Sequence, residues 1–243
     1  MRAPHCFSAR SKRSQGFTLV ELMLVLGIIL MILGLVAPSM GGILKGKKIE
    51  QAIASVNTAL ESARMEAISQ NSYVWVGVLN VAPANASSGQ DELWLLNFKS
   101  TAPSPSRVPT ESSGGKSIPV SPLTRIEGVS MVKVDTLPKT VFDVLPLTAQ
   151  DPNADLSAAE DSATPIYWTN GDKKKDTTFT KLVLFTPRGE AIRDSGTLDL
   201  PSPAPYICIG LAQTINGRMP PTTKDAAAVI VSGFSGRIST IRP

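Results

Sequence analysis

The sequence of 243 residues is poor in the side chains that most enzymes use for acid–base and metal chemistry. It holds one histidine, His5, so a metal site with two histidine ligands is excluded. Its two cysteines, Cys6 and Cys208, are too few for a four-cysteine zinc site or a disulfide framework. These shortages argue against Ser-His and other histidine-based catalysis. We therefore expect a protein that is not an enzyme and that holds no metal and no cofactor.

Net charge is also scarce in most of the chain. The sequence has 24 Lys+Arg and 20 Asp+Glu, and residues 1–16 contain four of the basic side chains and no acid. Subtracting these four leaves 20 basic against 20 acidic side chains, so residues 17–243 are formally neutral. A neutral body does not favour nucleic acid as a partner.

A long apolar segment, residues 17–44, follows the basic start, and Glu21 is its only charge. The uncharged stretch from Leu22 to Leu44 has 23 residues. As a helix it would span ~35 Å at ~1.5 Å per residue, enough to cross a hydrocarbon core of ~30 Å. The basic residues before it should stay cytoplasmic by the positive-inside rule. We expect a single pass through the inner membrane, with the N-terminus cytoplasmic and residues 45–243 outside the membrane.

Two ordinary interpretations of this segment explain it incompletely. A cleaved signal peptide would be shorter, would not contain Glu21, and would not have Pro38 at the centre of its cleavage site. A plain membrane anchor explains the length but not the acid. A carboxylate inside a membrane helix costs ~2.5–3.5 kcal/mol on insertion scales, so it needs a partner. The sequence offers none nearby in the same chain.

The segment Gly16-Phe17-Thr18-Leu19-Val20-Glu21 closely resembles the prepilin peptidase site of type IV pilins and type II secretion pseudopilins. The resemblance implies that a prepilin peptidase cuts after Gly16 and methylates the new amine of Phe17. It further implies that Glu21 pairs with the amine of a neighbouring subunit in a filament. Pro38 lies where many pilins have a helix-kinking proline.

The partners implied by this resemblance are the prepilin peptidase, other pilin-like subunits, inner-membrane lipid and the platform proteins of a secretion or pilus machine. After assembly the chain would be part of an extracytoplasmic filament. The alternative that stays open is a single-pass anchored β-domain acting alone as a binding or adhesion module.

Two C-terminal segments narrow the resemblance. Residues 184–190 (Leu-Phe-Thr-Pro-Arg-Gly-Glu) and residues 228–238 resemble the strand-turn motif and the terminal hairpin of the GspH/FimT-like group. The extra length, carried by polar loops, resembles the cassette pseudopilin-like proteins of Verrucomicrobia. An unrelated β-domain on a pilin-like anchor remains the alternative.

The rest of the pattern predicts an α+β, pilin-like fold, in which a long N-terminal helix packs on an antiparallel sheet. Residues 1–16 form a cleaved basic leader, residues 17–44 a transmembrane or filament-core helix, and residues 45–70 an amphipathic helix with apolar positions three and four apart. Residues 71–243 form a strand-rich domain with mobile loops at 100–122 and 148–165. The strands are expected at Tyr73–Leu79, Leu93–Phe98, Met131–Val134, Val141–Leu145, Ile166–Thr169, Phe179–Thr186, Tyr206–Ile215, Ala226–Val231 and Arg237–Ile241.

One spacing in the second loop is that of a calcium ligand set. Asp151-x-Asn153-x-Asp155 has the opening pattern of a calcium-binding loop. However, Leu156 stands where the turn glycine belongs and Ser162 where the bidentate acid belongs. We therefore expect an ordinary solvated loop.

Overall fold

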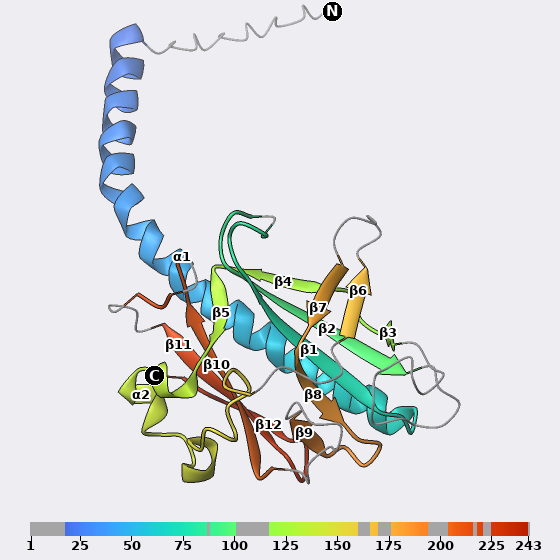
Figure 1. The fold of residues 1–243 in the computed structure, drawn as a ribbon. Coiled ribbons are helices and arrows are strands. Elements are labelled where there is room, and N and C mark those ends of the chain that lie inside the picture. Colours follow the sequence, from blue (N-terminus) through green and yellow to red (C-terminus); the bar gives the residue numbers. More distant parts are fainter. Residues whose placement is uncertain are drawn as a thin grey trace, which may run out of the picture. The chain divides into compact units, whose positions relative to one another are not determined.

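The computed structural model describes residues 18–86, 88–100, 117–159, 166–169, 176–193, 204–215, 218–220 and 225–242 (Figure 1). A long helix, α1 (Leu19–Ser69), precedes antiparallel β-sheets, so the expected α+β class is confirmed. The chain divides into two compact units, Met1–Leu44 and Lys45–Pro243.

The strands are β1 (Val74–Val81), β2 (Glu92–Ser100), β3 (Ser117–Pro119), β4 (Thr124–Glu127), β5 (Val129–Val132), β6 (Ile166–Thr169), β7 (Asp176–Phe179), β8 (Lys181–Phe185), β9 (Ala191–Arg193), β10 (Tyr206–Gln213), β11 (Ala226–Ser232) and β12 (Ile238–Ile241). The short helices are η2 (Val134–Thr136), α2 (Lys139–Phe142) and η3 (Leu147–Ala149).

The part of α1 in the second unit has one buried face. Its apolar residues recur three or four positions apart, which places them on one side of a helix. Each is at most 1% exposed, and they are Ile49, Ala52, Val56, Leu60, Ala63 and Ala67. The predicted amphipathic pattern is therefore confirmed in the buried face of this helix.

The strands form two principal sheets and a separate hairpin. The larger sheet has the order β3-β2-β1-β8-β9, with β4 also paired to β2, and the smaller sheet has the order β12-β11-β10-β5. Among the described strands, β6 pairs only with β7. Neighbouring strands pair antiparallel throughout these sheets, including the pairs β1–β8 and β5–β10, which are distant in the sequence.

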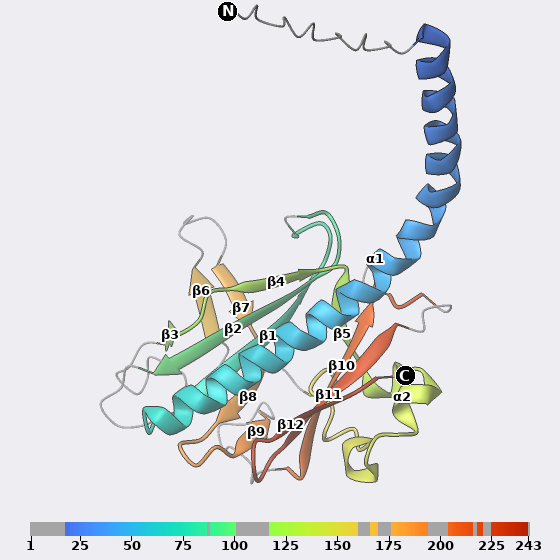
Figure 2. The same ribbon diagram turned by 180° about the vertical axis from the view of Figure 1, so that it is seen from behind.

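One hydrophobic cluster joins the buried face of α1 to both principal sheets. It contains Val56 and Leu60 from the helix, Val76 from β1, and Ile209 and Val229 from β10 and β11. Residues 45–69 of α1 cross one face of each sheet (Figure 2). Each Å² of apolar surface that this cluster removes from water stabilises the fold by about 25 cal/mol. The cluster is therefore the main source of stability in this unit.

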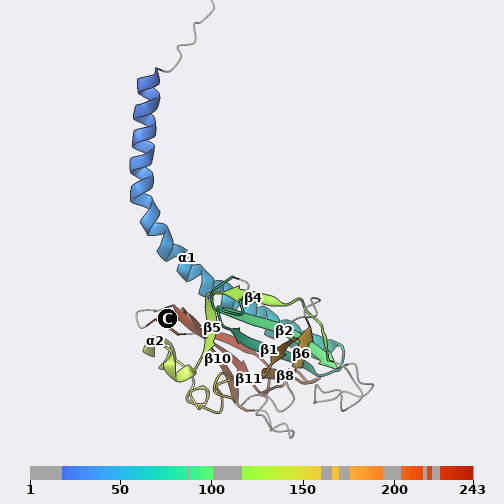
Figure 3. The same cartoon turned by 45° about the horizontal axis from the view of Figure 1, so that its top comes forward.

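The outer faces of the two sheets carry smaller cores of their own. β6 and β7 cover the larger sheet, where Phe179 meets Phe98 edge-to-face with ring centroids 5.4 Å apart. The segment of η2, α2 and η3 lies beside the smaller sheet (Figure 3). Val141 and Leu145 of this segment belong to one buried cluster with Cys208 of β10. Both sheets are therefore apolar on two faces, so their strands read as nearly continuous apolar runs.

Asn80 joins the two principal sheets through a backbone-like pair of hydrogen bonds. Its Nδ2 donates to the carbonyl oxygen of Met131 at 2.7 Å, and its Oδ1 accepts from the amide of Met131 at 2.8 Å. Because Asn80 lies in β1 and Met131 in β5, one side chain satisfies both polar groups of a residue in the other sheet.

The helix-facing positions of β2 change from apolar to polar along the strand. Leu93 and Leu95 belong to the central cluster, and Asn97 follows on the same face. Asn97 is 1% exposed, and its Nδ2 donates to the carbonyl oxygen of Ala59 and to Ser62 Oγ, both at 2.9 Å. This amide therefore attaches the strand to the helix at the margin of its buried face.

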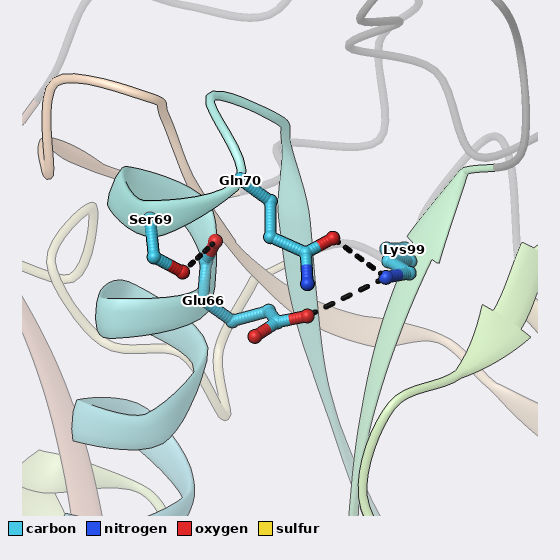
Figure 4. Close-up of polar contacts among 4 residues, drawn as sticks. All are labelled: Glu66, Ser69, Gln70 and Lys99. Carbon is cyan, nitrogen blue, oxygen red and sulfur yellow. Dashed lines mark hydrogen bonds and ion pairs between the residues drawn. The ribbon is translucent and has the colours of Figure 1, made fainter.

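Lys99 continues this series at the C-terminal end of α1 (Figure 4). Its Nζ lies 3.4 Å from Glu66 Oε1 and donates to Gln70 Oε1 at 2.8 Å. Ser69 Oγ donates to the carbonyl oxygen of Glu66 at 3.2 Å in the same turn. Because these side chains are partly exposed, we expect the ion pair to contribute at most about 1 kcal/mol.

Three expected strands differ from the structure. The segment expected as one strand at Phe179–Thr186 is divided, because Phe179 is the last residue of β7 and β8 begins at Lys181 in another sheet. The strand predicted at Val141–Leu145 is wrong, because this segment begins in α2, whose N-cap is Pro138. Val141 and Leu145 are both buried, and their spacing of four is that of a helix face. The strand expected at Met131–Val134 ends two residues earlier, and Val134 begins η2.

The two polar loops contain more order than their composition indicates. The segment 100–122 includes β3, and residues 101–116 lie outside the described residues. In the segment 148–165, described as far as residue 159, four apolar side chains are buried: Ala149, Ala154, Leu156 and Ala159. β4 and β9 were not expected either, because strands of three or four residues give little periodicity.

A buried carboxylate, Glu92, organises the start of β2. It is 1% exposed and accepts hydrogen bonds from Trp94 Nε1 at 2.7 Å and from the amide and hydroxyl of Ser88 at 2.9 and 2.7 Å. The Arg125 guanidinium stacks over the Trp94 ring at 4.6 Å. Burial alone would raise the pKa of Glu92, but these hydrogen bonds and the Arg125 charge outweigh it and lower the pKa.

We expect this carboxylate to make stability depend on pH in the acid range. Because the folded pKa lies below the unfolded one, the contribution is complete above about pH 4.5 and is lost as pH falls through the folded pKa. One proton taken up on unfolding limits the slope to about 1.4 kcal/mol per pH unit. Urea unfolding followed by circular dichroism between pH 3 and 7 should show this slope in the wild type and a smaller one in Glu92→Gln.

The matched control is the exposed Glu127, which lies directly opposite Glu92 in the β2–β4 register. Glu127→Gln leaves the hydrogen bonds from Trp94 and Ser88 to Glu92 in place, so the loss of stability in the acid range should remain. Equal slopes in the wild type and in Glu92→Gln would contradict the assignment.

Candidate processing and assembly site

The described N-terminal part of the chain begins with a capped helix. The Thr18 carbonyl accepts the first helical hydrogen bond from the Leu22 amide at 3.1 Å. Thr18 Oγ1 accepts from the Glu21 amide at 3.2 Å. Together these bonds make Thr18 the N-cap of α1, since an N-cap side chain satisfies a backbone donor in the first turn that has no helical partner.

The apolar side chains that follow the cap are exposed on every side of the helix. Those described between Leu19 and Leu33 range from 45% exposed at Val25 to 73% at Val20 and Met31. Glu21 is the only charged residue in this stretch. A helix that is apolar all round requires an apolar environment such as lipid or other helices.

Glu21 lies in the first turn of α1. The unpaired amides at a helix N-terminus carry partial positive charge, which favours a carboxylate at that position. From the sequence we expected no group in the same chain to stabilise the charge of Glu21. That expectation was incomplete, because the N-terminus of the helix supplies part of this stabilisation.

The predicted site residues are described to different extents. Gly16 and Phe17, the proposed cleavage and methylation positions, lie outside the described residues, and Glu21 lies within them. Pro38 lies inside α1, but its side chain is outside the description, so a kink there stays a prediction. None of the helices in the described part of the chain combines the length and hydropathy of a membrane span.

Sequence reasoning missed Thr18 as a functional candidate. The signal was present, because Thr18-x-x-Glu21 has the spacing of a capping box, with a hydroxyl at the N-cap and an acid at the third helical position. The interpretation of the motif assigned roles to Gly16, Phe17 and Glu21 and none to Thr18.

The two C-terminal motifs meet in space beside α1. Arg64 Nε donates to the Gly189 carbonyl at 3.4 Å. A Cβ on Gly236 would overlap the Gly189 carbonyl oxygen and lie 2.9 Å from Arg64 Cδ. Gly189 and Gly236 both have positive φ, +81° and +62°. The two turns, 47 residues apart, therefore need glycine for both conformation and contact.

The candidate calcium residues serve the fold. Asp155 is buried, with Oδ2 accepting from the Val134 amide at 2.9 Å and Oδ1 from the amide and hydroxyl of Ser157, both at 2.8 Å. Asp151 Oδ1 accepts from the Asn153 amide at 2.7 Å. Within the described stretches, no group of three or more His, Cys, Asp or Glu side chains could hold a metal ion.

The same region contains the one described cysteine, Cys208. It is fully buried in β10, and burial, with the Asp155 carboxylate as a second cause, raises its pKa to about 12. The thiol is therefore protonated at neutral pH and is a poor nucleophile.

Comparison with known proteins identifies the N-terminal segment. Residues 11–37 match the family model described as the prokaryotic N-terminal methylation motif. The match indicates a prepilin-peptidase substrate of the pilin type and supports a type IV pilin-like family, in which the motif has a structural and not a catalytic role. It covers the proposed cleavage site, the capped helix start and Glu21. No curated protein and no solved structure matches the chain.

Proposed function

We propose that this protein is a pilin-like subunit, a pseudopilin or minor pilin, which prepilin peptidase processes at Gly16–Phe17. The processed chain joins a type II secretion pseudopilus or a type IV pilus-like filament and is not an enzyme. The observation that carries the proposal is the methylation motif over residues 11–37, with Glu21 as the one charge in an exposed apolar helix.

Processing changes the charge at the start of the helix. Hydrolysis breaks the peptide bond between Gly16 and Phe17, and water supplies the new Gly16 carboxylate and the Phe17 amine. The amide nitrogen, which was neutral, becomes a cation, and methylation keeps that charge. A cation at a helix N-terminus is unfavourable, so the amine benefits from a nearby carboxylate.

Assembly brings a neighbour's amine to Glu21. In an apolar filament core, the pair offsets the desolvation of both charges, and a register that leaves either charge alone is strongly disfavoured. The stagger between neighbouring helices then follows from the distance between the Phe17 amine of one subunit and Glu21 of the next.

The second unit supports a pilin-like fold, because the amphipathic part of α1 shares one core with antiparallel strands. The contact between the Gly189 and Gly236 turns supports the GspH/FimT-like group, since it joins the two segments that resemble that group. We place the precursor in the inner membrane with residues 17–44 in lipid and the second unit in the periplasm. Its other partners are the platform proteins of the machine.

Mass spectrometry of the mature N-terminus tests the proposal. The expected species begins at methylated Phe17 and co-purifies with other pilin-like subunits. A protein that keeps Met1 and stays single in the membrane would favour the anchored β-domain acting as a binding or adhesion module.

We expect Glu21→Ala to separate cleavage from assembly. The change leaves Gly16, Phe17 and the Thr18 cap in place, because the cap uses the backbone amide of residue 21. Cleavage should therefore continue, while incorporation into sheared filaments falls more than about 100-fold, since removing one partner of a buried pair costs about 3–5 kcal/mol.

Glu61→Ala is the matched control, because Glu61 is an exposed glutamate of the same helix in the second unit. It should assemble like the wild type. Normal incorporation of Glu21→Ala would argue against the pairing role.

A further inference from the structure

A groove of about 440 Å³ lies beside α1 in the second unit, between the helix and the strand β2. Its helix wall contains Ser55, Thr58 and Ser62, which recur three or four positions apart and therefore share one side of α1. Asn97 of β2 and Ser121, which lies between β3 and β4, line the other wall. The volume is within the range of about 300–1,000 Å³ that is usual for small-molecule sites.

A break in the strand ladder shapes the wall opposite the helix. Between the last β2–β4 pair and the first β2–β3 pair, residues 120–123 face only residues 96–97 of β2. At this break the Asn97 amide donates to Ser121 Oγ at 3.1 Å, in place of a strand carbonyl. Bulges of this kind redirect side chains and are common next to functional sites.

Asn97 has a buried acceptor that the fold does not satisfy. The residue is 1% exposed, and its Nδ2 donates twice to the helix, to the Ala59 carbonyl and to Ser62 Oγ. Its Oδ1, also buried, accepts from no group in the described part of the chain. A buried acceptor without a donor is costly, so a donor that enters the groove and reaches Oδ1 is favoured. Ser62 is exposed and rotates about a single χ angle, which gives a ligand a path to this atom.

We propose that this groove binds a neutral mono- or disaccharide, with a sugar hydroxyl donating to Asn97 Oδ1. Every described residue that lines the groove is uncharged, so a phosphate, carboxylate or amine would find no opposite charge there. The serine, threonine, asparagine and glutamine side chains of the lining both donate and accept hydrogen bonds, as sugar hydroxyls do. This binding site goes beyond the proposed function, which assigns no ligand to the second unit.

The arrangement of the backbone argues against a peptide in the same groove. An extended peptide gains most of its affinity by pairing with an open strand edge. β2 is already paired with β1 on one edge and with β3 and β4 on the other, and the carbonyls and amides of α1 bond within the helix. The side chains are therefore the groups that the groove offers to a ligand.

The test uses the full-length chain in phospholipid nanodiscs, which contain no sugar-headed detergent. Titration calorimetry with lactose, maltose and cellobiose should give saturable binding of at least one disaccharide, with a Kd of about 1 mM or tighter. The side-chain amide resonances of Asn97 should shift during the same titration. A disaccharide with every hydroxyl methylated keeps its acceptors but has no donor for Oδ1, so it should not bind.

Ser62→Leu and Ser69→Leu form a matched pair of variants. Both serines are exposed on α1 and donate to the carbonyl three residues earlier, but Ser62 lines the groove and Ser69 does not. Ser62→Leu should weaken binding more than about 10-fold by filling the groove, whereas Ser69→Leu should bind like the wild type. Thr58→Leu should weaken binding equally while leaving the hydrogen bonds of Asn97 in place, so it serves as the test if Ser62→Leu disturbs the fold.

Four results would overturn the inference. The first is the absence of saturable binding for all three disaccharides, and the second is equal binding of the methylated form. Wild-type affinity in Thr58→Leu would place the bound sugar elsewhere on the protein. Binding of acetyl-tetraalanine amide without binding of any sugar would make the groove a peptide site.

Discussion

A precursor carrying Gly16→Leu should accumulate uncut in the membrane. In the proposed processing step, the residue before the scissile bond would enter the peptidase's site, and the sequence has glycine there, the one residue without a side chain. A site shaped for glycine excludes a leucine side chain by direct overlap, so cleavage should fall more than about 100-fold. Gel mobility and the mass of the N-terminal peptide measure the outcome.

Gly27→Leu is the matched control for this substitution. Gly27 lies in the exposed apolar part of α1, and a Cβ added there meets no atom within 4 Å. This variant should be cut like the wild type. If Gly16→Leu yields a chain that begins at Phe17, the assigned cleavage site is wrong.

Gly236→Ala should destabilise the second unit by about 2–4 kcal/mol. Residue 236 has φ +62°, which costs a residue with a Cβ about 1 kcal/mol or more. In addition, the new methyl group would overlap the Gly189 carbonyl and press on Arg64. Because the first of these is backbone, relief requires the two turns to separate, and overpacking of this kind costs about 1–3 kcal/mol.

Gly89→Ala separates the two contributions. Gly89 also has positive φ, +68°, but an added Cβ meets no atom within 4 Å. Its cost should be about 1 kcal/mol, from backbone conformation alone. Urea unfolding of the two variants should therefore differ by the steric cost at Gly236. Equal losses would mean that the contact between the turns is not tight.

The contact between these turns shows why the two C-terminal motifs belong together. Gly189 closes the turn after β8, with its amide donating to the Thr186 carbonyl at 2.8 Å. Gly236 closes the turn after β11, with its amide donating to the Ser232 carbonyl at 2.7 Å. Both turns require glycine for their positive φ, and their approach beside Arg64 adds a steric reason at residue 236, where a Cβ would overlap the Gly189 carbonyl oxygen.

Local patterns were sufficient for the features that depend on near neighbours in the chain. The uncharged run after Glu21 and the three- and four-residue spacing from Ile49 to Ala67 both concern single helices. The strands β1, β2, β10 and β11 were also predictable, because each is a run of apolar, β-forming residues bounded by turns. The capping role of Thr18 was equally local, and the Thr-x-x-Glu spacing would have indicated it.

The features that the sequence did not reveal depend on which distant residues become neighbours. Glu92, Asn97 and Asp155 are polar side chains, yet each is buried, and each has partners on another element or in a turn: Ser88, Ala59 and Val134. A buried polar group is stable only when its hydrogen bonds are made, and those bonds exist only once the sheets have paired. The helix start and the apolar segment were therefore determined by adjacent residues, whereas the buried polar contacts and the meeting of the two glycine turns were decided by the packing of the whole second unit.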